Sequence, residues 1–185
     1  MNFRTLTLAA MLSVSALSGA AFAQENPEVG GAAMFADKNI VENAVNSADH
    51  TTLVAAVQAA GLVETLSGEG PFTVLAPTNA AFEALPAGTV DTLLLPENKE
   101  QLATVLGCHV IPARALSTDI VGMVEADGGE HMVETVGGCE LTLKAENGTV
   151  TVTDENGTVA NVTIADVIQS NGVIHVIDAV LTPAM

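Results

Sequence analysis

The sequence predicts an α+β fold in which short helices pack around an antiparallel β-sandwich or wedge. Apolar residues recur at helical spacing in the first part of the chain, between residues 39 and 106. After Asp127 the chain instead consists of short β-prone runs separated by Gly-containing turns. Helices followed by a strand meander are typical of α+β domains. No internal repeat or linker divides the 185 residues, so we expect one folded domain over residues 38–185.

The N-terminal 23 residues have the pattern of a secretory signal peptide. Arg4 is their only charge, an apolar run follows from Leu6 to Leu17, and the segment ends in Ala21-Phe22-Ala23. This is a basic start, an apolar core and an A-x-A cleavage site. The apolar run is too short to span a bilayer. We therefore expect cleavage after Ala23, export to the periplasm or beyond, and a flexible leader over residues 24–37.

Two amphipathic helices are expected next. Residues 40–45 place apolar side chains on one helical face, and a second helix follows Asp49 as its N-cap. The second helix is broken near Gly61 and ends by Ser67-Gly68. Further along, residues 90–106 are again helical, in two pieces split by Pro96.

The first strand is expected at residues 72–76, a β-prone run bounded by Pro71 and Pro77. Thr78 or Asn79 then caps a short helix that turns Phe82 into the core. A second short strand, at residues 109–111, is stopped by Pro112.

The rest of the chain is expected to be a β-meander. Asn147-Gly148 and Asn156-Gly157 are hairpin signals, because these residues tolerate positive φ. The strands are expected at residues 132–136, 141–145, 150–153, 159–164 and 173–181. Asp154-Glu155, at one hairpin tip, is expected to be solvated.

The two cysteines, Cys108 and Cys139, are expected to form a disulfide, because an exported protein meets an oxidising compartment. Closing a loop of roughly 30 residues stabilises a fold by ~3–4 kcal/mol. The alternative is a reactive thiol or a metal site that uses Cys108 and His109. Adjacent residues on a strand point to opposite faces, which makes it difficult for both to join one site.

Three segments carry a family resemblance. Residues 70–82 (Gly-Pro-Phe-Thr-Val-Leu-Ala-Pro-Thr-Asn-Ala-Ala-Phe) and 171–183 (Asn-Gly-Val-Ile-His-Val-Ile-Asp-Ala-Val-Leu-Thr-Pro) resemble the two boxes that bracket a fasciclin (FAS1) domain. Between them, residues 108–112 (Cys-His-Val-Ile-Pro) resemble the family's Tyr-His box, with Cys in place of Tyr. The resemblance extends from about residue 40 to residue 183.

This resemblance implies a wedge-shaped antiparallel β-sandwich with flanking helices, in an exported or surface-tethered module for adhesion or matrix contact rather than catalysis. The implied partner is a cell-surface or matrix protein or polysaccharide. In animal members an Asp-Ile dipeptide and the Tyr-His region are linked to receptor binding. They correspond here to Asp166-Val167 and His109, which become the candidate partner-binding residues. The box residues expected to be structural are Phe72, Pro77, Thr78, Asn79, Phe82, Asn171, Gly172, His175 and Asp178.

The sequence gives weaker evidence for a catalytic or metal site than for the family. His109 and His175 lie in apolar runs, where a histidine held by a backbone partner is the simpler interpretation, and a metal site would need further ligands. His50 and His131 are expected in exposed loops. No G-x-S-x-G elbow or phosphate-binding loop occurs. We therefore expect no catalytic residue, no cofactor and no metal.

Charge and aromatic content limit the partners. The chain has 5 Lys+Arg against 22 Asp+Glu, a net charge of −17, with no Trp or Tyr. Such a chain repels phosphate backbones and lacks stacking platforms, which excludes nucleic acid. The acid surplus favours a dispersed monomer, and Phe35, Phe72 and Phe82 are expected in the core. A second hypothesis is a binding module for a small apolar ligand between the Ala- and Val-rich helices and the sandwich.

Overall fold

The computed structural model describes residues 26–184. The predicted signal peptide, and residues 24 and 25 of the predicted leader, lie outside the described residues. Residues 26–184 contain a seven-stranded sheet in the order β2-β1-β7-β6-β5-β4-β3. The strands are β1 (Phe72–Pro77), β2 (Val110–Ile111), β3 (His131–Glu134), β4 (Glu140–Glu146), β5 (Thr149–Thr153), β6 (Val159–Gln169) and β7 (Gly172–Ile177).

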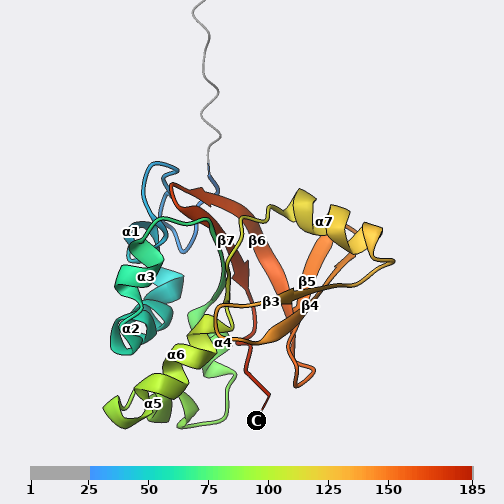
Figure 1. Cartoon of the computed structure of the whole chain (residues 1–185). Coiled ribbons are helices and arrows are strands. Elements are labelled where there is room, and N and C mark those ends of the chain that lie inside the picture. Colours follow the sequence, from blue (N-terminus) through green and yellow to red (C-terminus); the bar gives the residue numbers. More distant parts are fainter. Residues whose placement is uncertain (1–25, 185) are drawn as a thin grey trace, which may run out of the picture.

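The helices are short and divide between two sides of this sheet. They are α1 (Ile40–Ala44), η1 (Ala48–His50), α2 (Thr51–Ala60), α3 (Val63–Ser67), α4 (Asn79–Glu83), α5 (Thr89–Leu93), η2 (Pro96–Asn98), α6 (Lys99–Gly107) and α7 (Ser117–Ala126). In Figure 1, α1–α3 and α5–α6 lie on one side of β7, and α7 lies on the other, above β4 and β5. No helix of the described part of the chain has the length and apolar character needed to cross a bilayer.

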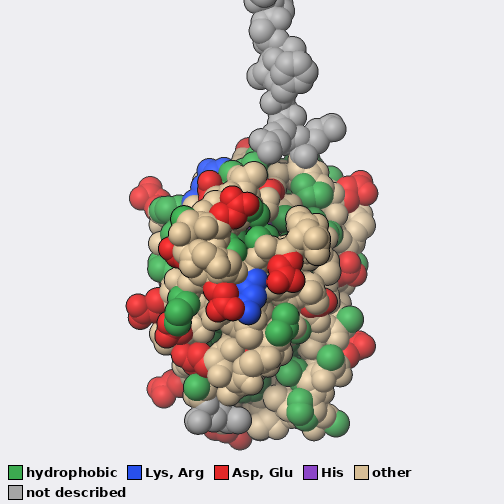
Figure 2. All heavy atoms as spheres, turned by 90° about the vertical axis from the view of Figure 1, so that its right-hand side faces the viewer, with side chains coloured by type: hydrophobic (Ala, Val, Ile, Leu, Met, Phe, Trp, Pro, Cys, Tyr) green, Lys and Arg blue, Asp and Glu red, His purple; other side chains and the backbone are tan. Residues whose placement is uncertain are grey.

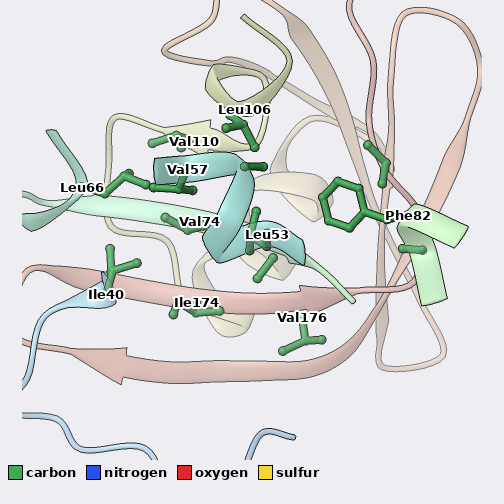
Figure 3. Close-up of a cluster of buried hydrophobic side chains, with 14 of the residues drawn as sticks. Ile40, Leu53, Val57, Leu66, Val74, Phe82, Leu106, Val110, Ile174 and Val176 are labelled. Atoms are coloured by element: carbon green, nitrogen blue, oxygen red, sulfur yellow. The ribbon is translucent and has the colours of Figure 1, made fainter. Parts of the chain in front are cut away.

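The first side, called the helical half below, consists of β2, β1 and β7 with α1–α6. Leu53 and Val57 of α2 cluster with Val74 of β1 and Ile174 of β7, as Figure 3 shows. Gly61, at φ 73°, ends α2 as the sequence predicts. This helical core joins side chains of α1, α2, α3 and α6 to the sheet, which is why the apolar stripes of these helices face inward.

The second side, called the meander half, consists of β3–β6 with α7. Ile120 and Val124, one helical turn apart on α7, pack into a second cluster with Leu141, Leu143 and Val152. β1 and β7 also contribute to this cluster, so both faces of these two central strands are buried. Their near-continuous apolar runs are typical of such strands.

The two ends of the sheet meet at one place. Val136, just after β3, donates its N–H to the carbonyl of Val110 in β2 at 2.8 Å. Cys108 and Cys139 form the expected disulfide there, with their Cα atoms 5.2 Å apart. The contact curves the sheet towards closure and gives the wedge that the resemblance implies.

The structure differs from the prediction in one helix of the meander half and in one strand pairing of the helical half. The sequence patterns do not predict α7, whose first turn is capped from a distant part of the chain. β1 and β7 pair in parallel, with Phe72 opposite Gly172, whereas the other neighbouring strands are antiparallel. A parallel pair needs a long crossover, and the whole chain between β1 and β7 supplies it.

Three local predictions are wrong. The described part of the predicted leader is packed: Asn26 bonds both backbone groups of Ile168, and Val29 and Met34 are buried. Asp49 does not cap α2, because a 3₁₀ turn places His50 at that position. Phe35 is 47% exposed rather than core, and Lys38 lies over its ring.

Candidate partner-binding surface

The candidate surface centres on a corner in β6. The pairing of β6 with β7 slips twice, between Val162 and Ile164 and between Ile164 and Val167. Asp166 lies in this irregular stretch with φ 59°. Asp and Asn adopt the left-handed region more readily than most residues, and such bulges re-aim side chains. The corner therefore leaves the Asp166 side chain partly exposed.

The Asp166 carboxylate is already engaged. It accepts the backbone N–H of Ser117 at 2.6 Å and also the Ser117 hydroxyl. Ser117 is the first residue of α7, so a carboxylate from β6 satisfies a free donor at that helix start and lies at the favourable end of its dipole. The two residues are 49 positions apart in sequence, so this cap is not visible locally, although Asp119 also accepts the N–H of Leu116 at the same helix start.

His175 supports the same corner from beneath. Its Nδ1 accepts the N–H of Asp166 at 3.3 Å, and its Nε2 lies 2.8 Å from the carbonyl of Ala115, just before α7. This pairing needs the neutral ring with its proton on Nε2. Burial lowers the pKa of His175, against the opposing effects of the Ala115 bond and the Asp166 charge. The interpretation as a core histidine therefore fits its geometry.

His109 joins the helical half to the C-terminal segment. Its Nδ1 donates to the Val105 carbonyl at 2.8 Å, and its Nε2 accepts the N–H of Leu181 at 2.9 Å. Burial lowers the pKa of His109 to about 4, against the Val105 bond and the charge of Asp154. The side chains of His109 and Val167 are both buried. Of the three predicted contact residues, Asp166 is the one whose side chain reaches the surface.

Two asparagines of the boxes, Asn79 and Asn171, hold neighbouring elements together through hydrogen bonds. Asn79 accepts the N–H of Thr52 at 3.0 Å and donates to the Ala48 carbonyl at 2.9 Å, which fastens α4 to the start of α2. Asn171 accepts the N–H of Ile40 at 3.0 Å and donates to the carbonyls of Leu66 and Gly68.

The other box residues are also structural. Thr78 caps α4 by accepting the N–H of Ala81, and Phe82 is buried. Asp178 accepts the backbone and side-chain amides of Asn161 at 2.7 and 2.8 Å. Gly172 lies so close to the Phe72 carbonyl that any side chain there would collide with it.

Three polar residues contradict the sequence prediction. His131 is partly buried and begins strand β3 instead of lying in an exposed loop. His50 is buried rather than exposed, with Nδ1 2.8 Å from the Ser47 hydroxyl, and burial lowers its pKa. Asp154 is buried rather than solvated. Its carboxylate accepts the N–H groups of Asn156, Thr158 and Thr182 at 2.8–3.0 Å. An Asp two residues before an Asn-Gly pair is a typical Asx-turn signal that could have indicated this role.

The second hypothesis depends on space between helices and sheet. A cavity of about 50 Å³ lies there, lined mainly by apolar side chains such as Leu53, Val57 and Val74. Small-molecule sites usually measure ~300–1,000 Å³. This cavity is well below that range, whereas a more open pocket of about 310 Å³, lined by residues such as Leu62, Phe72 and Val110, reaches its lower end, so a small apolar ligand stays a hypothesis. No group of three His, Cys, Asp or Glu side chains within residues 26–184 could hold a metal ion.

Comparison with known proteins decides the family. The fasciclin domain model matches residues 48–183. The chain belongs to the fasciclin family. Among its relatives, the Synechocystis protein sll1483 is 48% identical over 162 residues, covering 88% of this chain and 83% of that protein. The cell surface glycolipoprotein MPB83 of Mycobacterium bovis is 33% identical over 170 residues, covering 89% and 70%.

The fold agrees with the family. A solved pair of FAS1 domains from the insect cell adhesion molecule fasciclin I superposes with a TM-score of 0.68, covering 78% of this chain and 50% of that one. The sequences share 18% identity, so this likeness bears on the fold alone. The wedge of strands flanked by short helices, predicted from three boxes, is thus the fasciclin fold.

Proposed function

We propose that this fasciclin domain acts outside the cytoplasm, in the periplasm or as a secreted protein, as a non-enzymatic adhesion module that contacts a surface or matrix protein or polysaccharide. The observation that carries the proposal is the family match over residues 48–183. A similar protein, MPB83 of Mycobacterium bovis, is a cell surface glycolipoprotein, which supports it. Recovery of a mature chain that begins at Gln24 would test the export step.

The corner at Asp166 is the first contact surface to test. It combines a non-Gly residue at positive φ with a partly exposed carboxylate. Strained backbone of this kind clusters at functional sites. Because the same carboxylate caps α7, a simple Asp166→Ala change would mix lost contact with lost folding. Asp166→Asn is the better variant, since Asn tolerates positive φ and keeps an acceptor for the Ser117 N–H.

The experiment compares attachment of a deletion strain complemented with wild type, Asp166→Asn, or Asp91→Asn. Asp91 is an exposed acid of α5 in the helical half and gives the same change in charge. We expect Asp166→Asn to weaken attachment at least about fivefold, as for one lost charged contact. The Asp91 control keeps wild-type attachment. Equal attachment by all three would remove Asp166 from the contact surface.

A further inference from the structure

The outer edge of β3 is an unused strand edge. β3 is the last strand of the sheet order and pairs with β4 alone. Thr135 donates its N–H to Cys139 at 2.9 Å, so the backbone groups of odd-numbered residues here face β4. Antiparallel strands alternate between such pairs and pairs that face outward. The N–H and C=O groups of Met132 and Glu134 therefore point away from β4.

The next outward-facing residue shows how this edge can be used. Val136 also directs its N–H away from β4 and donates it to the Val110 carbonyl of β2. β2 then ends at Ile111, and Pro112 follows, which has no N–H to offer a ladder. Pairing within the chain therefore uses one backbone hydrogen bond of this edge and does not continue along β3. Among the described residues, no strand pairs with the outer side of β3 at Met132 and Glu134.

The charges beside the edge select the kind of partner. Glu134 lies directly opposite Glu140 in a pair that the ladder does not bond, and like charges there are destabilising. Glu140 also donates its N–H to Glu155, which brings a third carboxylate. Within residues 26–184 none of the three forms an ion pair, whereas Glu130 pairs with Lys144 at 2.6 Å. A basic side chain would relieve this repulsion.

The exposed side chains near the β3 edge are also consistent with a basic partner. Met132 is 60% exposed and offers an apolar contact on the outer face. Figure 2, which views this side of the molecule, shows acidic side chains scattered among small hydrophobic patches. A second copy of the chain would bring the same acids and a net charge of −17, so self-pairing is opposed. Among the described residues, these carboxylates do not form a group that could hold a metal ion.

We propose that the β3 edge at Met132 and Glu134 binds an extended, Lys- or Arg-bearing segment of a partner protein by strand addition. The main chain of the segment pairs with the outward groups of β3, and its basic side chains contact Glu134 and Glu140. Main-chain bonds supply affinity in this mode, and side chains supply selectivity. The inference rests on the proposed adhesive function for its partner, although the edge itself is tested without it.

The test titrates ¹⁵N-labelled oxidised protein with a blocked peptide of alternating Lys and Val. The control peptide is N-methylated at two adjacent central residues, which removes a donor from each edge but keeps the charge. We expect shift changes concentrated in residues 131–136 and at least about tenfold weaker binding of the methylated peptide. Shifts spread over the acidic surface, equal binding of both peptides, or no binding would overturn the proposal.

Protein variants separate charge at the edge from charge elsewhere. Glu134→Lys removes a complementary charge, whereas Glu83→Lys, at the end of α4, makes the same change in the helical half. We expect Glu134→Lys to weaken peptide binding about tenfold or more and Glu83→Lys to weaken it no more than about twofold. If the peptide does not bind but attachment persists, the edge is wrong and the adhesive function stands. If the peptide binds but deletion of the protein leaves attachment unchanged, the edge stands and the adhesive function is wrong.

Discussion

The helical half and the meander half bury their sheet differently. In the helical half, β1 and β7 have both faces covered, one by α1–α6 and the other by the second cluster. In the meander half, strands such as β5 alternate between buried and more exposed residues, because α7 covers one face only. This difference in burial is the basis for our proposal that the helical half is a scaffold and that the meander half makes the contact.

The join between the halves should carry the largest single contribution to stability. Replacing both cysteines with Ala is expected to lower the free energy of unfolding by about 3–4 kcal/mol, since the cross-link closes a 31-residue separation. Urea unfolding of the oxidised protein and the double variant measures this. A loss below about 1 kcal/mol would show that the backbone bond between Val136 and Val110 holds the join without it.

Truncation of one side chain in each core compares the two halves directly. Ile120→Ala in α7 and Leu53→Ala in α2 should each cost about 2–4 kcal/mol, because both remove buried methyl groups. The double variant should cost roughly the sum if the cores are independent. A clear departure from additivity in urea unfolding would mean that the shared strands couple the halves into one core.

The pH dependence of stability should follow the buried histidines. The pKa of His109 is lowered to about 4 in the folded protein, so between pH 6.5 and 4 the unfolded chain binds the extra proton. Stability is therefore full above pH 6.5 and falls as the pH drops towards 4. The His109→Gln variant should lose up to about 1.4 kcal/mol per pH unit of this slope. If the free energy of unfolding of the wild type and of the variant changes with pH in the same way, His109 is not the group responsible.

The smallest expected effect is local to α7. Asp166→Gly keeps the positive φ accessible but removes the acceptor for Ser117, so it should cost about 1 kcal/mol. Asp166→Asn should cost less. Hydrogen exchange checks the location: faster exchange is expected in the first turn of α7 and not in α2. Uniform acceleration across both halves would mean that the cap stabilises the whole domain.

The sequence predicted most helices of the helical half because the signals for these helices are local. Stripes at helical spacing, Gly61 and the cap at Thr78 each act within a few residues. The disulfide was also predictable, since two cysteines in a chain with a predicted signal peptide favour it. The three boxes added the family, and the structure assigns their polar residues to clamps, caps and buried supports.

The parts that sequence reasoning missed depend on distant partners. The start of α7 is capped by Asp166, and Gly122 interrupts its helical pattern, although Ile120 and Val124 have helical spacing. The parallel pairing of β1 with β7 joins segments about 100 residues apart. His50 and Asp154 each have local partners as well as a remote one, near Ala76 for His50 and at Thr182 for Asp154, and the remote contacts that help to bury them are not visible in the local sequence.

The central claim is that contact is made by the meander half. Hydrogen–deuterium exchange of the oxidised protein, with and without extracellular matrix isolated from the producing cells, tests it most directly. We expect protection at residues 131–136 and around Ser117 and Asp166, with α2 and α6 unchanged. Protection concentrated on α2 and α6, or none anywhere, would contradict the account.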